Sequence, residues 1–226
     1  MKRVVSVTIL CALLALPASA AMTTVNIDFQ PANGALYSGL GMAADTGTYW
    51  NPVGTGAVND LLASDGITVT DIDVSSTYTG AFGNAGNDLL RDRLIFSPDG
   101  SPAITLSGLD ASRLYNIYLY AGYYGQRYTI DGVSKELTGL DWDDDQPAWI
   151  EGTHYVSFMG VSPASGTISI DIFDTGINTT PFGDSPATVV SGMQIQEAPV
   201  PVPVPGAALL ALIGAGLVRT RFRRQT

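Results

Sequence analysis

Period-two alternation of apolar and polar residues runs through the middle of the chain, and it restricts the possible fold more than any other feature. In residues 23–29 (TTVNIDF) and 114–120 (LYNIYLY), apolar residues occupy alternate positions. Such alternation, with β-branched and aromatic residues, is typical of strands that bury one face. The pattern recurs in six further segments: 66–74, 103–106, 126–130, 154–159, 167–173 and 188–196.

Turn-forming residues separate these segments, and no part of residues 21–198 sustains a helical period. Asp131-Gly132 lies between two alternating runs and predicts a tight hairpin, because glycine tolerates a positive φ. Residues 57–63 and 87–93 could each form one or two helical turns. Many short strands around one core predict an all-β fold, an antiparallel β-sandwich of the jelly-roll-like kind.

The first 20 residues have the three parts of a secretory signal peptide. Lys2 and Arg3 precede an uncharged run over 4–16, and Pro17-Ala18-Ser19-Ala20 supplies small residues before a cut after Ala20. The alternative is an N-terminal core helix. Cleavage would remove Cys11, the single cysteine, and would leave a domain over 21–198 without a disulfide. Its length is sufficient for one well-packed core.

Charge is divided unequally between the middle and the ends of the chain. All 21 acidic residues lie between Asp28 and Glu197, and only five of the 11 basic residues lie there, for a formal net charge of −16. Such a domain repels phosphate backbones, so nucleic acid is excluded as a partner. Cations or a neutral polymer such as a polysaccharide are better candidates. The alternative is that the acidity only keeps an exported domain soluble.

The C-terminal end, residues 199–226, combines alternating prolines, an uncharged run and an arginine cluster. The uncharged run over 206–218 would span roughly 20 Å as a helix, against a hydrocarbon thickness of about 30 Å. The preceding prolines cannot continue that helix, since each lacks an N–H. The arginines that follow favour the cytoplasmic side of a membrane. The segment is therefore a marginal transmembrane helix.

The order of these parts resembles the PEP-CTERM family of C-terminal sorting signals. The match consists of Val202, Pro203, Val204, Pro205 and Gly206, then the short apolar helix, then Arg219, Arg221, Arg223 and Arg224. Val204 stands where the family usually has Glu, which is nearer to its VPLPA-like variant. A plain membrane anchor and an unstructured tail are the alternatives.

This resemblance implies a route and a destination. The route is export through the inner membrane of a Gram-negative bacterium, transient anchoring by the C-terminal helix, and recognition by an exosortase-like membrane protease. The destination is the cell surface or the extracellular space, and family members are often linked to exopolysaccharide or biofilm matrix. The segments 106–110, 114–120 and 190–195 also resemble the galactose-binding-like β-sandwich bodies of many such proteins.

The densest acidic run offers a candidate metal site. Asp141, Asp143 and Asp145 have the 1, 3, 5 spacing of a calcium loop, and carboxylate oxygens suit Ca²⁺. Gln146 and Gly152 stand where an EF-hand needs Gly and Glu, so the prediction is a looser Ca²⁺ site in a loop. An ordinary solvated acidic loop is the alternative.

Aromatic residues near this acidic run predict a sugar-binding site. Tyr123, Tyr124 and Trp142 are the candidates, because flat rings can stack on sugar C–H faces while carboxylates accept hydroxyl hydrogen bonds. Trp149, between Ala148 and Ile150, is expected in the core.

Catalytic residues are not predicted. His154 is the single histidine and begins an alternating segment, which favours a structural role; no Gly-x-Ser-x-Gly motif is present. The sequence thus favours an exported, non-catalytic cell-surface or exopolysaccharide-matrix protein. The first alternative is a carbohydrate-binding module, with or without calcium. The second is a polysaccharide hydrolase or lyase, since 21 acidic residues leave a facing carboxylate pair open.

Overall fold

The computed structural model describes residues 22–31, 36–44, 47–54, 56–82, 89–90, 92–96, 102–122, 124–138, 149–178 and 188–198. The predicted signal peptide, the sorting signal, Asp141, Asp143, Asp145, Tyr123 and Trp142 lie outside these residues. The chain divides into two units, and Met22–Pro199 is the unit described below.

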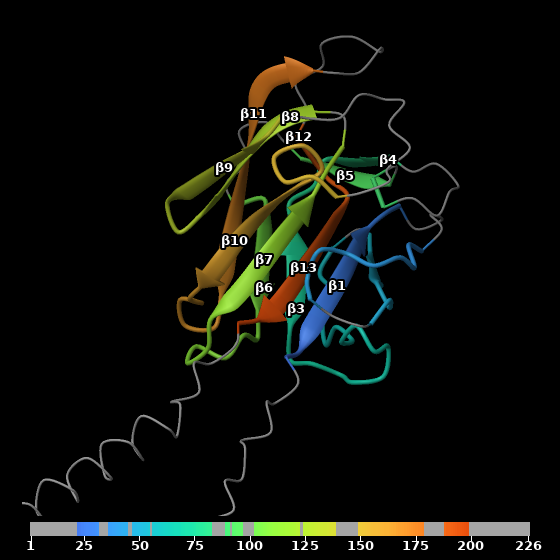
Figure 1. The fold of residues 1–226 in the computed structure, drawn as a ribbon, viewed down its shortest axis with the longest axis vertical. Coiled ribbons are helices and arrows are strands. Elements are labelled where there is room, and N and C mark those ends of the chain that lie inside the picture. The colour runs from blue at the N-terminus through green and yellow to red at the C-terminus, as the bar shows by residue number, and fades with distance from the viewer. Residues whose placement is uncertain are drawn as a thin grey trace, which may run out of the picture. The chain divides into compact units, whose positions relative to one another are not determined.

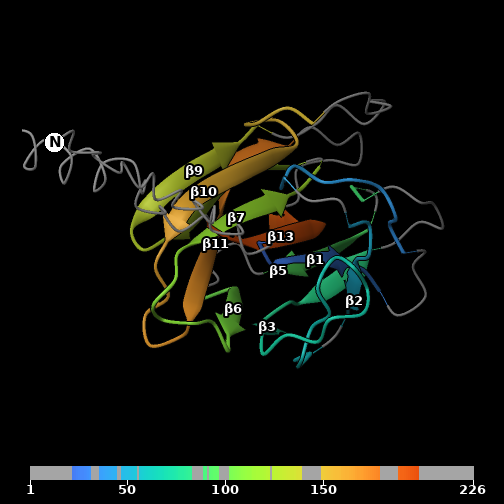
Figure 2. The same ribbon diagram turned by 60° about the horizontal axis from the view of Figure 1, so that its bottom comes forward.

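The described residues of this unit form three sheets (Figures 1 and 2). Sheet 1 has the order β10 (Tyr155–Val161), β7 (Tyr115–Tyr120), β13 (Gly192–Glu197), β1 (Thr24–Phe29) and β2 (Asn51–Val53). Sheet 2 has the order β3 (Asp73–Ser76), β6 (Ile104–Ser107), β11 (Ile168–Asn178), β8 (Tyr124–Ile130) and β9 (Val133–Leu137). Sheet 3 has the order β12 (Thr188–Val190), β5 (Arg93–Phe96) and β4 (Gly80–Phe82). Neighbouring strands are antiparallel except for β1 and β2, which are parallel.

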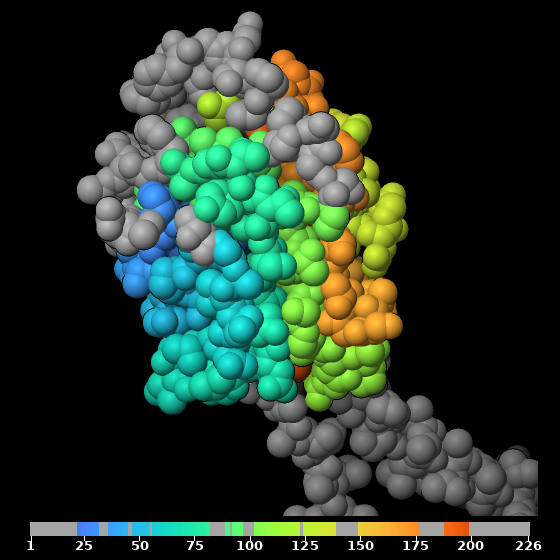
Figure 3. All heavy atoms as spheres, turned by 180° about the vertical axis from the view of Figure 1, so that it is seen from behind, coloured from blue at the N-terminus to red at the C-terminus, as the bar shows by residue number. Residues whose placement is uncertain are grey.

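Sheets 1 and 2 enclose one apolar core. Sheet 1 faces the viewer in Figure 1, and the opposite side, seen in Figure 3, shows residues 56–82 beside β6, β9 and β11. The alternating apolar residues of the strands point into the core, as the period-two pattern predicts. Examples are Val25, Ile27 and Phe29 of β1 and Ile168, Ile170 and Ile172 of β11, all at most 2% exposed. The chain changes sheet at every step from β6 to β8 and again from β9 to β11. The predicted all-β, jelly-roll-like antiparallel β-sandwich is confirmed.

The predicted hairpin at Asp131-Gly132 is also confirmed. Ile130 of β8 pairs with Val133 of β9, so the connection has two residues. Both take a positive φ, 49° at Asp131 and 77° at Gly132, as a tight turn of this length requires.

Residues 57–76 differ from the prediction. The expected helical turn over 57–63 is wrong, because Val58 and Leu62 instead form isolated bridges to Val74 and Val69. Of the strand predicted over residues 66–74, only residues 73 and 74 belong to a strand, β3, which continues to Ser76. The segment 188–196 is divided at Ser191 into β12 and β13, which belong to different sheets.

Candidate functional site

The outer face of sheet 1 carries polar side chains that are buried. Alternation directs Asn26 and Asp28 of β1 and Gln194 of β13 away from the core, yet none of the three is more than 1% exposed. A stretch that we name the cover segment, residues 36–44 and 47–50, lies over this face. All six residues of β1 are buried in consequence, rather than every second one.

Hydrogen bonds join the cover segment to the sheet. Oε1 of Gln194 accepts the Ala43 N–H at 2.9 Å and the Tyr120 hydroxyl at 2.5 Å. Nε2 of Gln194 donates to Oδ1 of Asn26 at 2.8 Å, and Nδ2 of Asn26 donates to the Tyr49 carbonyl at 2.9 Å. The buried amides of the sheet thus replace water as partners for the backbone of the cover segment.

Gly41 allows this close approach. A Cβ at this position would lie 2.2 Å from Oε1 of Gln194, whose position is fixed by its hydrogen bonds. A side chain at residue 41 would therefore separate the cover segment from the sheet.

Aromatic rings form a second cluster on the same face, which we name the aromatic layer: Tyr37, Trp50, Tyr118, Tyr120, Trp149 and Tyr155. Tyr120 is at its centre, with ring centroids at 6.1 Å from Trp50, 4.9 Å from Trp149 and 5.9 Å from Tyr155. Edge-on and tilted contacts of this kind stabilise more than their buried area alone. Nε1 of Trp50 donates to the Gly39 carbonyl at 2.9 Å, which ties the layer to the cover segment.

Asp28 lies beneath the cover segment and has an unusual ionisation. Its Oδ2 accepts the Tyr37 N–H at 2.9 Å, while its Oδ1 is buried and makes no hydrogen bond to any residue that the structure describes. Burial raises the pKa of Asp28 to about 7; the Tyr37 hydrogen bond opposes this rise, and the nearby Asp92 carboxylate adds to it. A carboxyl group thus titrates near neutral pH at the contact between sheet and cover segment.

Among the residues singled out in the sequence, the structure describes Tyr124 of the candidate sugar site, together with Trp149 and His154. Trp149 packs in the aromatic layer, partly buried, and donates from Nε1 to the Leu40 carbonyl at 3.1 Å. Tyr124 is in sheet 2, half-buried against the main core, with the Arg93 guanidinium carbon 6.0 Å from its ring centroid. His154 is buried, and its Nδ1 accepts the Ile150 N–H at 2.8 Å, a structural contact.

Sequence reasoning did not find Asn26, Asp28, Gln194 or Tyr120 as parts of a site. The pattern of each strand places them on the polar or outer face, where solvent is the usual neighbour. One available signal was the amide-rich alternation of β13 (GMQIQE), because amides suit backbone partners as well as water.

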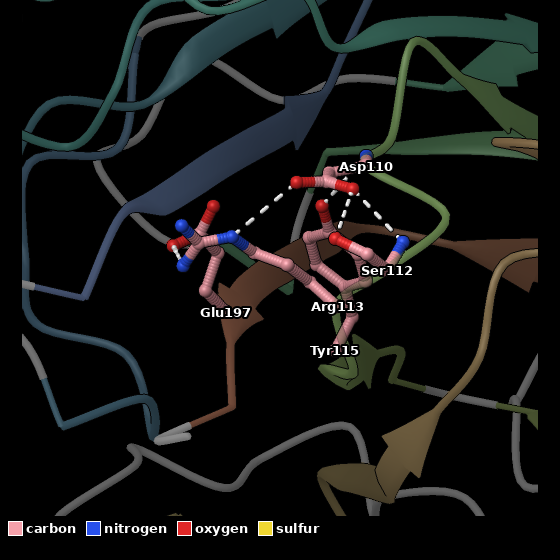
Figure 4. A network of polar contacts seen from close by, with 5 residues as sticks. All are labelled: Asp110, Ser112, Arg113, Tyr115 and Glu197. Atoms are coloured by element: carbon pink, nitrogen blue, oxygen red, sulfur yellow. Dashed lines mark hydrogen bonds and ion pairs between the residues drawn. The ribbon is translucent and has the colours of Figure 1, made fainter. Parts of the chain in front are cut away.

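A separate polar network lies where the described chain ends (Figure 4). Arg113 donates from an Nη to Oε2 of Glu197 at 3.0 Å, and its Nε is 3.5 Å from Oδ2 of Asp110. Oδ1 of Asp110 accepts the N–H of Ser112 at 2.8 Å and its hydroxyl at 2.7 Å. The Ser112 hydrogen bonds, then the nearby Arg113 charge, hold the pKa of Asp110 below its usual value. The network fixes the β6–β7 connection to the end of β13.

Within the described ranges, no group of three or more His, Cys, Asp or Glu side chains is placed to hold a metal ion. A helix long and apolar enough to cross a membrane is likewise not found among these residues. The candidate calcium ligands and the candidate transmembrane helix both fall elsewhere in the chain.

No family model and no curated protein matches this chain. Among solved structures, it is similar to the X-ray crystal structure of protein YXIM from Bacillus subtilis, with a TM-score of 0.44 and 12% sequence identity. The match covers 79% of this chain and 42% of that one, so this chain spans less than half the length of the Bacillus protein.

Proposed function

We propose that this chain is an exported, non-catalytic protein of the cell surface or the exopolysaccharide matrix, sorted by an exosortase-type system. The two ends of the sequence supply the export and sorting signals of this proposal. The observation that supports it most directly is that the first and last strands of the domain, to which these ends are attached, lie next to each other. The Glu197 N–H donates to the Thr23 carbonyl at 3.0 Å, and β1 pairs antiparallel with β13.

Both signals therefore attach side by side, at one end of a sandwich whose core is complete between Val25 and Ile195. Removing residues 1–20 and the C-terminal signal would leave this core intact. Such a domain suits display through its C-terminal end.

The non-catalytic part of the proposal is supported by how the buried polar groups are used. Asn26, Gln194 and Tyr120 hydrogen-bond to one another or to the backbone of the cover segment. Groups held in this way stabilise a rigid layer and are not directed at a bound substrate.

Fractionation of a Gram-negative host that carries an exosortase tests the proposal. The full chain is expected at the cell surface or in the medium, and in the inner membrane of a host without the protease. A variant with Arg219, Arg221, Arg223 and Arg224 changed to Ser is expected to lose sorting. The matched control is Arg127→Ser, since Arg127 is an exposed cation on β8 far from the tail in sequence. Equal distribution of all four samples would overturn the proposal.

A carbohydrate-binding function is the second candidate, and the aromatic layer favours it. Trp149 and Tyr118 of this layer are only partly buried, so their rings remain open to a ligand. Its calcium dependence would rest on Asp141, Asp143 and Asp145. Calorimetric titration with Ca²⁺ tests that dependence, and Asp143→Asn is expected to abolish the binding heat.

A further inference from the structure

A preorganised carboxylate lies at the border of sheet 1, outside the cover segment. Glu151 lies four residues before the start of β10. Its Oε1 accepts three donors: the Ser157 hydroxyl at 2.6 Å, the Ser157 N–H at 3.3 Å and Nζ of Lys135 at 3.3 Å. Within the described part of the chain, its Oε2 has no hydrogen-bond partner. The side chain is 48% exposed, so this second oxygen is held in a fixed orientation while water can still reach it.

Two tyrosines, Tyr118 and Tyr155, lie close enough to the same carboxylate to interact with its charge. Tyr118 of β7 is directly opposite Ser157 of β10, and these two strands run side by side in Figure 1. The ring centroids of Tyr118 and Tyr155 are 6.3 Å apart, with the planes inclined at 45°. Burial, and after it the Glu151 charge, raises the pKa of both hydroxyls. Neither hydroxyl makes a hydrogen bond to any residue that the structure describes.

The charges at this place select the class of ligand. A cation would be repelled by Lys135, which already neutralises the charge of Glu151. The Nζ of Lys135 is also 5.9 Å from the Phe158 ring centroid. An anion would be repelled by the Glu151 carboxylate and by the net negative charge of the domain. A neutral ligand with hydroxyl groups avoids both repulsions.

We propose that Tyr118, Tyr155 and Oε2 of Glu151 form a binding site for a neutral pyranose saccharide. The free carboxylate oxygen accepts a pair of sugar hydroxyls, the partly exposed ring of Tyr118 stacks on a C–H face, and the tyrosine hydroxyls donate to ring or hydroxyl oxygens. Ser157 and Lys135 are positioning residues, because they act by holding Oε1. The inference rests on the carbohydrate-binding candidate function and does not depend on where the protein is sorted.

Direct titration of the full chain tests this site. The protein is kept in a zwitterionic detergent, because glucoside and maltoside detergents would themselves compete. The probes are cellotetraose, maltotetraose, xylotetraose and mannotetraose, added separately while the ring signals of ¹³C-labelled tyrosine are followed by NMR. We expect saturable shifts of the Tyr118 and Tyr155 signals with at least one of these probes.

Variants separate this site from others. Glu151→Gln keeps the size of the side chain and is expected to weaken binding at least tenfold, while Glu136→Gln, a change of an exposed carboxylate on β9, leaves it unchanged. Tyr118→Phe keeps the ring and the fold and is expected to lose affinity a few-fold; Tyr118→Ala is expected to abolish binding, with circular dichroism as the check on folding.

Three results would overturn the proposal: no response to any of the four saccharides, a response that Glu151→Gln leaves intact, or a response confined to Tyr124. Sorting is measured separately by fractionation. A chain that is sorted normally but binds no saccharide would therefore remove this site and leave the proposed location standing.

Discussion

Replacing Asp28 with Asn is expected to remove a large pH dependence from the stability of the sandwich. The pKa of Asp28 rises from 3.8 to about 7 on folding, mainly because the carboxyl group is buried. The folded state therefore binds the proton more tightly than the unfolded state does. The stabilisation is fully present below about pH 4 and is lost as the pH rises through about 7.

The magnitude follows from the size of this shift. Each unit of pKa corresponds to about 1.4 kcal/mol, so a rise of roughly three units corresponds to about 4 kcal/mol in total. Between pH 4.5 and pH 8 the free energy of unfolding should fall by about 3 kcal/mol through this group alone. The Asp28→Asn variant has no ionisable group at this position, so its free energy of unfolding should not fall for this reason between pH 4.5 and pH 8.

Urea unfolding of the full chain at pH 4.5, 6, 7 and 8, with and without the substitution, measures the effect. The difference between the two proteins isolates Asp28 from other groups. Asp65, Asp110 and Glu151 have lowered pKa values and contribute stability of the opposite sign, lost as the pH falls. We expect the variant to gain about 3 kcal/mol relative to the parent from pH 4.5 to 8. A difference that stays constant across this range would refute the reasoning about burial.

Two further experiments test the packing of a glycine and the strength of an ion pair. Gly108→Ala should destabilise by more than about 3 kcal/mol, because φ is +73° and the new Cβ would lie 1.6 Å from the Asp71 carbonyl oxygen. Gly132→Ala, at φ +77° but in open space, should cost only about 1–2 kcal/mol in urea unfolding, and equal costs would contradict this account. A double-mutant cycle with Arg113→Gln and Glu197→Gln should give a coupling below about 1 kcal/mol, because Arg113 is 41% exposed; a coupling above about 2 kcal/mol would be too large for a screened surface pair.

The sequence predicted those strands whose two faces differ in polarity. β1, β7, β8, β10 and β11 were expected within a few residues, because each places alternate side chains in the core. β2 and β4 were not expected. Each has only three residues. β2 pairs with β1, from which residues 30–50 separate it, and β4 pairs with β5 across residues 83–92. Local periodicity carries no information about such pairs.

The candidate site was less predictable than the strands. Period two tells which side chains share a face of a strand, but it does not tell what covers that face. The sequence pattern therefore predicts that Asn26 and Asp28 face solvent, whereas in the structure the cover segment buries both. Tyr120 and Tyr124 are four residues apart, yet they belong to different sheets because the chain crosses the sandwich between β7 and β8. Distance along the sequence therefore does not tell which aromatic residues lie on the same sheet.

The intact mass of the mature protein is the most direct test of the central claim, which is export followed by C-terminal sorting. The chain is produced in a Gram-negative host with an exosortase and collected from the cell surface and the medium. The account predicts a product that begins at Ala21 and lacks the apolar and arginine-rich residues after Gly206. A surface product whose mass still includes Thr226 would contradict sorting by cleavage.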